Sequence, residues 1–381
     1  MQRKKLLIIS HTEHYQDPNG RVMGWGPTVN EVNFLSDYWE EVVHIACLHS
    51  GQAPSGSSAY TNENIRFVAI PPYGGTNFLD KLLVFTKLPK IISQVNKNIK
   101  GATEVQLRVP TAMGVFLIPY FTFFVKRKFV FWVKYAGDWN QKNPPLSYAF
   151  QRWWLKKNFA GCAVTINGFW PDQPKHCHSF ENPSLTRDDI LQGKKVSELK
   201  QFEAPFVFAF VGRLEDPKGV TRIIEALKKV PQNFIKSVHF IGDGKKMESY
   251  KNEASFLKDK VFFHGFLDKT QVHLIIKETH FLLLPSTASE GFPKVIAEAA
   301  CYGAIPVVSN VGSINHYINE SNGFIWKPFT EVSYEQLLLE AVNSTSEDLK
   351  HISTKATALA KWFTFDSYLQ KLKETVLKEN I

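Results

Sequence analysis

The chain has 381 residues, of which 44% are hydrophobic and 21% charged, a balance that excludes a disordered chain, a collagen-like fibre and a coiled-coil rod. Four cysteines in this length also exclude a small disulfide-stapled fold. The formal net charge is +9, of which +7 lies in residues 1–190. This asymmetry favours an anionic partner for the first half, with a solvated basic surface as the alternative.

Apolar runs alternate with segments of helical period along the first half, which is typical of an α/β chain with parallel sheets. The pattern predicts a strand at Leu6–Ser10, a long loop over His11–Pro27 and a helix that begins near Thr28. Further strands are predicted at Val42–Leu48, Ile65–Ile70, Val105–Val109, Lys128–Tyr135 and Ala163–Asn167, and helices at Phe78–Ile99 and Ala112–Val125.

The second half repeats the α/β pattern after a polar stretch, residues 184–204, in which we expect the linker between domains. Its predicted strands are Phe206–Val211, Val238–Ile241, Val261–Phe263, Phe281–Pro285 and Ile305–Ser309. The predicted fold class is therefore α/β, with two Rossmann-like doubly wound domains that face a central cleft. We expect domains at 1–190 and 200–364, with an amphipathic helix at 365–381 that ends the second domain or completes the first.

No segment of the sequence has the pattern of a signal peptide or a membrane span. The apolar run Leu6–Ile9 is shorter than the ~7–15 residues of a signal-peptide core. The run Ala112–Val125 falls short of the ~20 residues that cross a bilayer. We therefore expect a cytoplasmic protein. The adjacent residues His176, Cys177 and His178 lack a second ligand pair at zinc-site spacing, so we expect no metal site.

Two predicted loops of the second half hold cations and carboxylates that suit a phosphorylated sugar ligand. Arg213 and Lys218 lie between Gly212 and Gly219, after a strand, where a guanidinium and an ammonium bind phosphate oxygens. The alternative is an exposed turn with ordinary basic residues. After the strand at 281–285 come Glu290, Gly291, Phe292 and Pro293, and Glu298 follows on the next helix. Pro293 fits the first helical position, and the free N–H groups there suit an anion.

Two weaker signals follow neighbouring strands. Gly242 lies in a Gly-Asp-Gly turn that either approaches a ligand or simply turns the chain. Phe266 follows His264 and Gly265, where the backbone suits the edge of a nucleobase, a plain turn being equally compatible.

The order and spacing of these motifs over residues 206–325 resemble glycosyltransferase family 4, a family of retaining enzymes with the glycosyltransferase-B fold. The resemblance implies that Arg213 and Lys218 neutralise the diphosphate of a nucleotide-sugar donor. It implies that Glu290, with backbone N–H groups near Gly291, Phe292 and Pro293, positions the donor sugar, and that Glu298 holds the ribose. Gly24 and Gly26 resemble the glycine-rich loop of the family under the diphosphate.

One position departs from the family pattern. Many members have a histidine after a middle strand of the first domain, whereas this chain has Tyr135, Ala136, Gly137 and Asp138 there. Asp138 is the nearest polar candidate for a catalytic role, and a structural turn aspartate is the alternative.

The predicted reaction is sugar transfer from a nucleotide diphosphate sugar to an acceptor hydroxyl, with retention at the anomeric carbon and without a metal or other cofactor. The acceptor is expected to be a saccharide or a lipid-linked saccharide of bacterial-type surface polysaccharide or glycolipid assembly. It would bind the basic first domain at the cytoplasmic membrane face. The alternatives are a sugar-nucleotide epimerase or phosphorylase of the same fold, or a basic nucleic-acid-binding protein, although no nucleic-acid module is recognisable.

Overall fold

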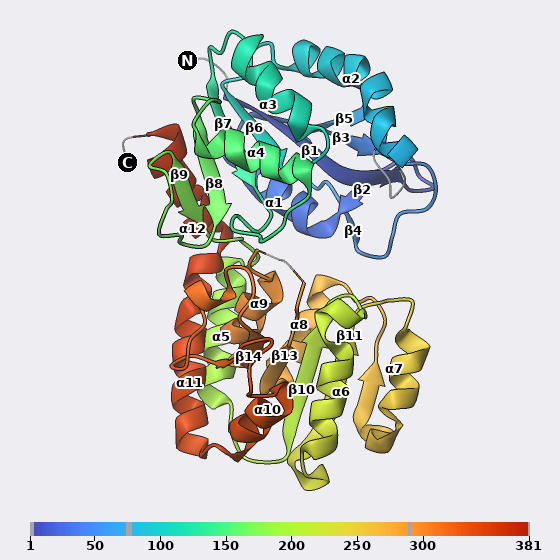
Figure 1. Cartoon of the computed structure of the whole chain (residues 1–381), viewed down its shortest axis with the longest axis vertical. Coiled ribbons are helices and arrows are strands. Elements are labelled where there is room, and N and C mark those ends of the chain that lie inside the picture. The colour runs from blue at the N-terminus through green and yellow to red at the C-terminus, as the bar shows by residue number, and fades with distance from the viewer. Residues whose placement is uncertain (1–3, 74–77, 289–290, 380–381) are drawn as a thin grey trace. The chain divides into compact units, whose positions relative to one another are not determined.

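The computed structural model of the chain describes residues 4–73, 78–288 and 291–379. It contains two α/β units, one formed by Met1–Phe180 with Leu369–Ile381 and the other by Glu181–Tyr368 (Figure 1). Each unit has its own largely parallel sheet, which confirms the predicted α/β class.

The first unit is built on a sheet in which neighbouring strands of the central set all run parallel. In spatial order these strands are β5 (Ile65–Ile70), β3 (Glu41–Leu48), β1 (Lys5–Gln16), β6 (Glu104–Val109), β7 (Val130–Tyr135), β8 (Ala163–Asn167) and β9 (Cys177–Phe180). Two short strands, β2 (Val22–Trp25) and β4 (Ser57–Ala59), pair antiparallel beside the end of β1.

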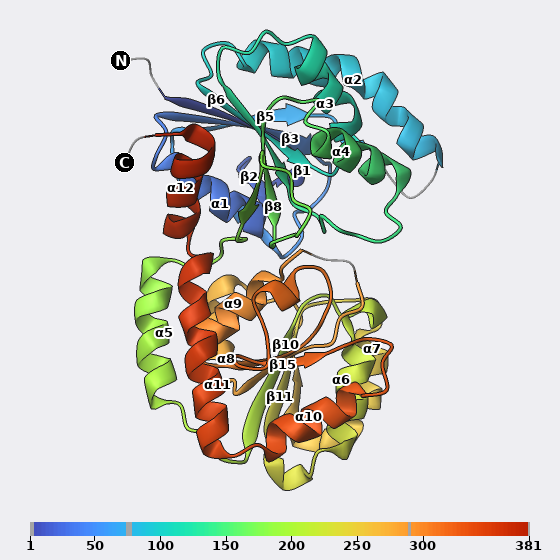
Figure 2. The same cartoon turned by 60° about the vertical axis from the view of Figure 1, so that its left-hand side comes forward.

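Helices cover both faces of this sheet. One face holds α1 (Gly26–Ser36), and the other holds α2 (Phe78–Asn98), α3 (Gly114–Phe123) and α4 (Leu146–Lys156) (Figure 2). Side chains alternate between the faces along each strand. The residues Val105, Leu107 and Val109 of β6 therefore join the apolar core beneath α2–α4, whereas Gln106 and Arg108 point to the α1 face.

The second unit has six parallel strands in the spatial order β12 (Val261–Phe263), β11 (Ile235–Ile241), β10 (Phe206–Val211), β13 (Phe281–Leu284), β14 (Ile305–Ser309) and β15 (Phe324–Trp326). The chain leaves β10 toward β11 and β12 and then returns to the opposite side of β10 at β13. This reversal between β10 and β13 is the topological switch point at which open α/β sheets bind ligands.

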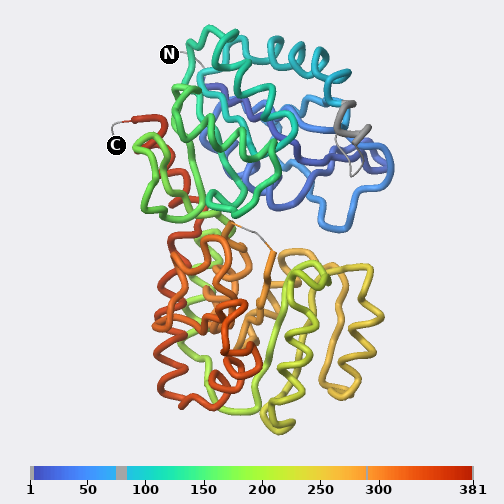
Figure 3. Tube along the Cα trace, viewed as in Figure 1, coloured from blue at the N-terminus to red at the C-terminus, as the bar shows by residue number. Residues whose placement is uncertain are grey.

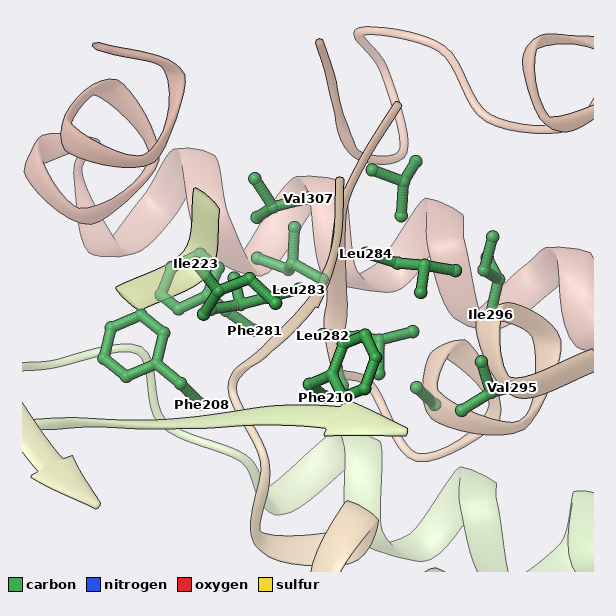
Figure 4. Packing of buried hydrophobic residues seen from close by; sticks show 14 of the residues in the cluster. Phe208, Phe210, Ile223, Phe281, Leu282, Leu283, Leu284, Val295, Ile296 and Val307 are labelled. Atoms are coloured by element: carbon green, nitrogen blue, oxygen red, sulfur yellow. The ribbon is translucent and has the colours of Figure 1, made fainter. Parts of the chain in front are cut away.

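The helices of the second unit are α5 (Arg187–Leu199), α6 (Val220–Lys229), α7 (Met247–Glu253), α8 (Lys269–Glu278), α9 (Lys294–Cys301), α10 (Tyr334–Asn343) and α11 (Ser346–Leu359). Between them and the sheet, Phe208 and Phe210 of β10 pack with Phe281 of β13 and with Val295 and Ile296 of α9 (Figure 4). These strands are apolar at consecutive positions because both faces of the sheet are covered.

The segment predicted as a loop over His11–Pro27 is instead largely a hairpin, so that prediction was wrong. β1 continues to Gln16 and pairs antiparallel with β2, and the turn is held by Asp17, whose carboxylate accepts hydrogen bonds from the N–H groups of Asn19 and Arg21 at 2.9 and 2.8 Å. An Asp side chain that bonds to the backbone two residues on is a strong turn former.

Residues 184–204, in which we expected the linker, contain the helix α5. Its start is fixed by Thr186 and Asp189, which form a reciprocal capping box, and Gly193 is the buried residue of this otherwise polar helix. A helix that buries so little shows weak apolar period, which is why its pattern was missed. The short strands β9 and β15 were also missed, whereas β5, β8, β10, β12 and β14 match their predicted bounds.

The last helix, α12 (Phe365–Leu372), begins in the second unit and ends in the first. Beyond it the chain runs along the first unit (Figure 3), where residues 373–377 contact β7. The ammonium of Lys371 lies 5.4 Å from the ring centroid of Phe180, and Lys4 Nζ lies 2.8 Å from the carboxylate of Glu379. No helix within the described ranges combines the length and the apolar character that a membrane span requires.

Candidate donor site in the second unit

The loops that follow β10 and β13 meet at the switch point. The N–H of Thr287 donates to the carbonyl of Pro217 at 2.8 Å, and Arg222 Nη1 donates to the carbonyl of Pro285 at 3.0 Å. Gly219 ends the first loop with φ of +89°, and a Cβ added there would lie 2.4 Å from the carbonyl oxygen of Pro285. Only glycine fits both the backbone conformation and the close approach. Gly219 is therefore required for the contact between these two loops.

The loops after β11 and β12 join the same end of the sheet. Gly242 N–H donates to Gly265 O at 2.8 Å, and Leu214 N–H donates to Asp243 O at 2.9 Å. A Cβ on Gly242, whose φ is +133°, would lie 1.9 Å from the carbonyl oxygen of Gly212. The structure therefore brings the four loop motifs found in the sequence into one backbone-bonded group at the carboxyl ends of β10–β13.

Two cations belong to the first of these loops. Arg213 is 71% exposed and lies 3.3 Å from the carboxylate of Glu215, a surface ion pair that leaves most of the guanidinium in solvent. Lys218 is half-buried and ends a short 3-10 turn immediately before α6. A hydrogen bond from Lys246, together with one from Tyr250, lowers the pKa of Asp216 in the same turn, so this residue is an anion at neutral pH.

The segment before α9 has mixed roles. Glu290 lies outside the described residues. Phe292 is buried and stacks on Phe363 with ring centroids 4.5 Å apart, so its side chain belongs to the core. Pro293 is the N-cap residue of α9, which begins at Lys294, so the prediction of Pro293 as the first helical residue was wrong by one position. Glu298 is half-buried on α9.

Phe266 lies in the loop between β12 and α8 and is 41% exposed. It follows Gly265, whose φ is +66°, and His264, whose ring nitrogen lies 2.9 Å from that of His239. The loop thus presents one exposed aromatic side chain, while His264 stacks on His239 of β11.

The remaining predicted site residues lie in the first unit. Gly24 is in β2, not in a loop as expected, and a Cβ there would lie 2.3 Å from the ring of His14. Gly26 begins α1 and donates to the carbonyl of Gly56 at 2.9 Å. Asp138 Oδ1 accepts a hydrogen bond from the N–H of Asn140 at 2.9 Å, the geometry of an Asx turn.

Sequence reasoning missed a buried polar cluster under α1. Glu31 of α1 accepts from Arg108 at 3.0 Å and from Lys134 at 2.6 Å, and each of these three side chains is about nine-tenths buried or more. Arg108 and Lys134 are register partners on β6 and β7. The sequence signal that could have predicted this cluster is the charged residue within each of two apolar strands, Arg108 in β6 and Lys134 in β7.

A second chain of hydrogen bonds lies in the same unit. The hydroxyl of Tyr60 lies 2.6 Å from His44 Nδ1 and 2.7 Å from His14 Nε2, and His44 Nε2 lies 2.7 Å from the hydroxyl of Ser10. Burial lowers the pKa of His14 to about 4 and that of His44 well below its usual value, so both imidazoles are neutral at pH 7.

The described residues include no group of three or more His, Cys, Asp or Glu side chains that could hold a metal ion. Of the adjacent residues considered above, His176 bonds through Nε2 to the carbonyl of Leu155 at 2.8 Å, and Cys177 is buried in β9.

Part of the second unit is similar to known proteins. Residues 192–358 match the family described as glycosyl transferases group 1. The chain is 29% identical over 164 residues to a glycogen synthase of Acholeplasma laidlawii, which covers 40% of this chain and 33% of that protein. It is 32% identical over 151 residues to an Escherichia coli UDP-Gal:alpha-D-GlcNAc-diphosphoundecaprenol alpha-1,3-galactosyltransferase, which covers 38% of this chain and 37% of that protein. The match therefore spans about a third of the length of these relatives.

Solved structures resemble the whole chain. Sucrose-phosphate synthase from Thermosynechococcus elongatus has a TM-score of 0.72 at 13% identity and covers 99% of each chain. The Anabaena protein HepE, in complex with UDP and glucose, has a TM-score of 0.63 at 17% identity and covers 99% of this chain and 100% of its own. At these identities the likeness concerns the fold. Residues 192–358 thus resemble the glycosyl transferases group 1 family, and the two α/β units of the chain have the glycosyltransferase-B fold.

Proposed function

We propose that the protein is a retaining glycosyltransferase that moves a sugar from a nucleotide diphosphate sugar to an acceptor hydroxyl. The observation that supports this most is the group of four backbone-bonded loops at the switch point, which lies within the segment matched to the family. In this group the cations Arg213 and Lys218 stand beside the start of α6. A switch point of this kind is where nucleotides bind in doubly wound sheets.

Each part of the donor has a matching group in this proposal. Arg213 and Lys218 bind the diphosphate, and Glu298 accepts hydrogen bonds from the ribose hydroxyls. Glu290, with backbone N–H groups of Gly291 and Phe292, holds the donor sugar. Phe266 and the backbone of its loop suit a nucleobase, since an exposed ring offers a stacking surface.

Sugar transfer breaks the bond between the anomeric carbon and the diphosphate oxygen, which keeps the electron pair. The acceptor oxygen bonds to the anomeric carbon, and its proton passes to a base. Arg213 and Lys218 stabilise the charge that builds on the leaving diphosphate, so they supply the role that a metal ion has in other transferases. The sequence contains no Asp-x-Asp motif, which is consistent with a metal-independent reaction.

Retention is compatible with two routes. In one, the acceptor attacks the face that the diphosphate leaves, and the diphosphate itself takes the proton. In the other, a carboxylate forms a covalent glycosyl intermediate before the acceptor attacks. Asp138 is the candidate polar group from the first unit.

We further propose an acceptor that is a saccharide or a lipid-linked saccharide in surface polysaccharide or glycolipid assembly, met at the cytoplasmic membrane face. The names of two relatives support this class of acceptor: the Escherichia coli galactosyltransferase above, and a lipopolysaccharide 1,6-galactosyltransferase of Salmonella typhimurium that is 35% identical over 115 residues, 28% of this chain and 31% of that protein. The basic first unit would receive this acceptor.

A panel of nucleotide sugars, read by thermal shift, tests the donor class. We expect one or more to raise the melting temperature, and product analysis with acceptor sugars to show transfer that survives EDTA. Glu298→Gln should weaken donor binding about tenfold or more, because hydrogen bonds to a charged group contribute ~1.5–3 kcal/mol. Absence of any shift, or activity lost with EDTA and restored by Mg²⁺, would contradict the proposal.

A further inference from the structure

The first sheet has a switch point of its own. The chain passes from β1 to β3 and β5 and then returns to the opposite side of β1 at β6. The pairing of β1 with β6 ends at Ile9, the register partner of Leu107. Open α/β sheets bind ligands where two such neighbouring strands part. The residues that directly follow Ile9 are therefore placed to meet a ligand.

A bulge in β1 begins at this point. On β1, pairing with β3 stops at Ile9 and resumes at Glu13. On β3 the same interval is shorter, from Ile45 to Cys47, so β1 carries extra residues here. Bulges often lie beside active sites, where they redirect a side chain. The residue at the middle of this bulge is His11.

One nitrogen of the His11 ring is committed and the other is open. Nε2 lies 3.2 Å from the carbonyl oxygen of Tyr73, and because a carbonyl only accepts, Nε2 carries the hydrogen. Burial lowers the pKa of His11, so the ring is neutral at pH 7 and Nδ1 holds a bare lone pair. Within the described part of the chain no group bonds to Nδ1, and the side chain is half-buried. This nitrogen is therefore open to a hydrogen-bond donor from a ligand.

A ring of hydrogen bonds lies behind the bulge, and one carbonyl fixes its direction. His14 Nδ1 lies 2.9 Å from the carbonyl oxygen of Thr12, so Nδ1 carries the hydrogen and Nε2 of this neutral imidazole accepts. The Tyr60 hydroxyl therefore donates to His14, and Nδ1 of the neutral His44 donates to the Tyr60 oxygen. His44 Nε2 is then the acceptor for the hydroxyl of Ser10.

The ring closes on the two residues that flank His11. The N–H of Thr12 donates to the hydroxyl oxygen of Ser10 at 3.2 Å, so the N–H and the carbonyl of Thr12 both belong to the ring. Ser10, His14 and His44 are each at most 1% exposed, so solvent does not compete for these bonds. Buried polar networks that are fully satisfied are rigid. The ring therefore fixes the backbone on both sides of His11 and, with it, the direction of Nδ1.

We propose that His11 binds the acceptor saccharide by accepting, at Nδ1, a hydrogen bond from one of its hydroxyl groups, and that Tyr60 positions His11 through the ring. This inference rests on the proposed sugar transfer and assigns a contact to its second substrate.

The chemistry of Nδ1 selects a hydroxyl over the other ligands of a sugar transferase. A bare lone pair accepts a hydrogen bond from a hydroxyl but repels the oxygens of an ionised diphosphate, which also only accept. A metal ion is another partner for a neutral imidazole, but the described ranges contain no group of three or more His, Cys, Asp or Glu that could hold one.

The test measures kcat/KM for methyl α-glucoside, methyl α-galactoside and methyl α-N-acetylglucosaminide, with the nucleotide sugar that stabilises the wild type most. His11→Gln keeps an amide near the position of Nε2 but has no acceptor near that of Nδ1. We expect it to lower kcat/KM for the preferred glycoside about tenfold, the effect of one lost hydrogen bond. His11→Asn places a carbonyl oxygen near the position of Nδ1 and should recover most of the loss.

The matched control is His176→Gln in the same unit. His176 is also half-buried, and its Nε2 also lies close to a main-chain carbonyl, that of Leu155, at 2.8 Å. This variant should transfer sugar like the wild type. Every variant should bind the nucleoside diphosphate of the chosen donor with the Kd of the wild type, because the donor loops belong to the second unit.

Tyr60→Phe tests the positioning role. It removes the hydroxyl that joins His14 to His44, so kcat/KM for the glycoside should fall about threefold while nucleotide binding is unchanged. Combined with His11→Gln it should cause no further loss, since the ring acts through His11, whereas a general structural defect would add to the first loss.

The outcomes separate this inference from the proposed function. An active wild type with an equally active His11→Gln, or equal losses in His11→Asn and His11→Gln, would overturn binding through Nδ1 alone. Additive losses in the double variant would overturn the role of Tyr60. A wild type that neither binds nor uses any nucleotide sugar would overturn the proposed function and this inference with it.

Discussion

The two parallel sheets end differently at the side where their ligands are expected. In the second unit, the carboxyl ends of β10–β13 are closed by backbone: Gly219, Gly242 and Gly265 let four loops bond to one another. In the first unit, the space under α1 is filled by side chains, with Glu31 between two buried cations. The loops of the second unit approach one another because glycines have no side chains, whereas the space under α1 in the first unit is filled by buried charged side chains.

The two regions should differ in how well they tolerate amino-acid substitutions. A loop group held by backbone bonds can keep its shape while the side chains that face solvent vary, because those side chains make none of the bonds. A buried ion cluster depends on each of its members, since removal of one leaves an unpaired charge in a low-dielectric interior. We therefore expect the two sheets to respond to different substitutions.

The largest effect is expected at Glu31. Glu31→Gln leaves Arg108 and Lys134 buried without their carboxylate, which typically costs ~3–5 kcal/mol of unfolding free energy. The matched control is Glu41→Gln in the same unit, because Glu41 is more exposed than Glu31 and its pairs with Lys5 at 3.7 Å and Arg66 at 3.5 Å are long, and such solvent-accessible pairs contribute ~0–1 kcal/mol. Urea denaturation measures both, and equal losses would refute the distinction.

The second unit has a buried cation of its own, Lys200, which bonds to the carbonyl of Thr279. Burial lowers its pKa to about 7. Between pH 7 and about 10 the unfolded chain holds a proton that the folded chain has lost, so stability should rise with pH, by on the order of 3 kcal/mol.

The measurement is the free energy of unfolding of the wild type and of Lys200→Met at pH 7 and pH 10. The variant should lack this rise, whereas Lys195→Met, a change at an exposed residue of α5, should keep it. A pH dependence that is the same in all three proteins would show that Lys200 stays charged when folded.

A smaller effect separates two glycines of the donor loops. Both have positive φ, but a Cβ on Gly242 meets the carbonyl oxygen of Gly212 at 1.9 Å, whereas a Cβ on Gly265 has nothing within 4 Å. Gly265→Ala should cost the ~1–2 kcal/mol of the backbone conformation alone. Gly242→Ala should cost about 2 kcal/mol more, because a backbone atom must move. Thermal unfolding measures the melting temperatures of the two variants. Similar melting temperatures would mean that the loops do not depend on the close contact at Gly242.

The sequence predicted the second unit well because its signals are local. An apolar run marks each buried strand, and a glycine, a cation or a proline directly after it marks the loop. Gly212, Arg213 and Gly219 lie within eight positions of each other, so the motif can be recognised from a short segment of the sequence.

The first unit was predicted less well because its cluster is assembled from distant positions. Glu31 meets Lys134 across more than a hundred residues, and Tyr60 joins His14 to His44 only after three strands have paired. The hairpin at Asp17 was missed although its turn residues were visible, since the polar positions of β1 hide its strand period. The sequence predicts Gly24 in a ligand-binding loop, but the absence of a side chain at Gly24 instead makes room for the ring of His14.

We propose that Arg213 stabilises the departing diphosphate, and steady-state kinetics of Arg213→Ala with the identified donor tests this role directly. Its matched control is Arg187→Ala, since Arg187 is also exposed in the second unit and pairs with Asp366 at 3.0 Å. We expect Arg213→Ala to lower kcat ~10²–10³-fold with a smaller rise in KM, Arg213→Lys to recover part of the loss, and Arg187→Ala to match the wild type. A folded Arg213→Ala enzyme with the kcat of the wild type would contradict the account.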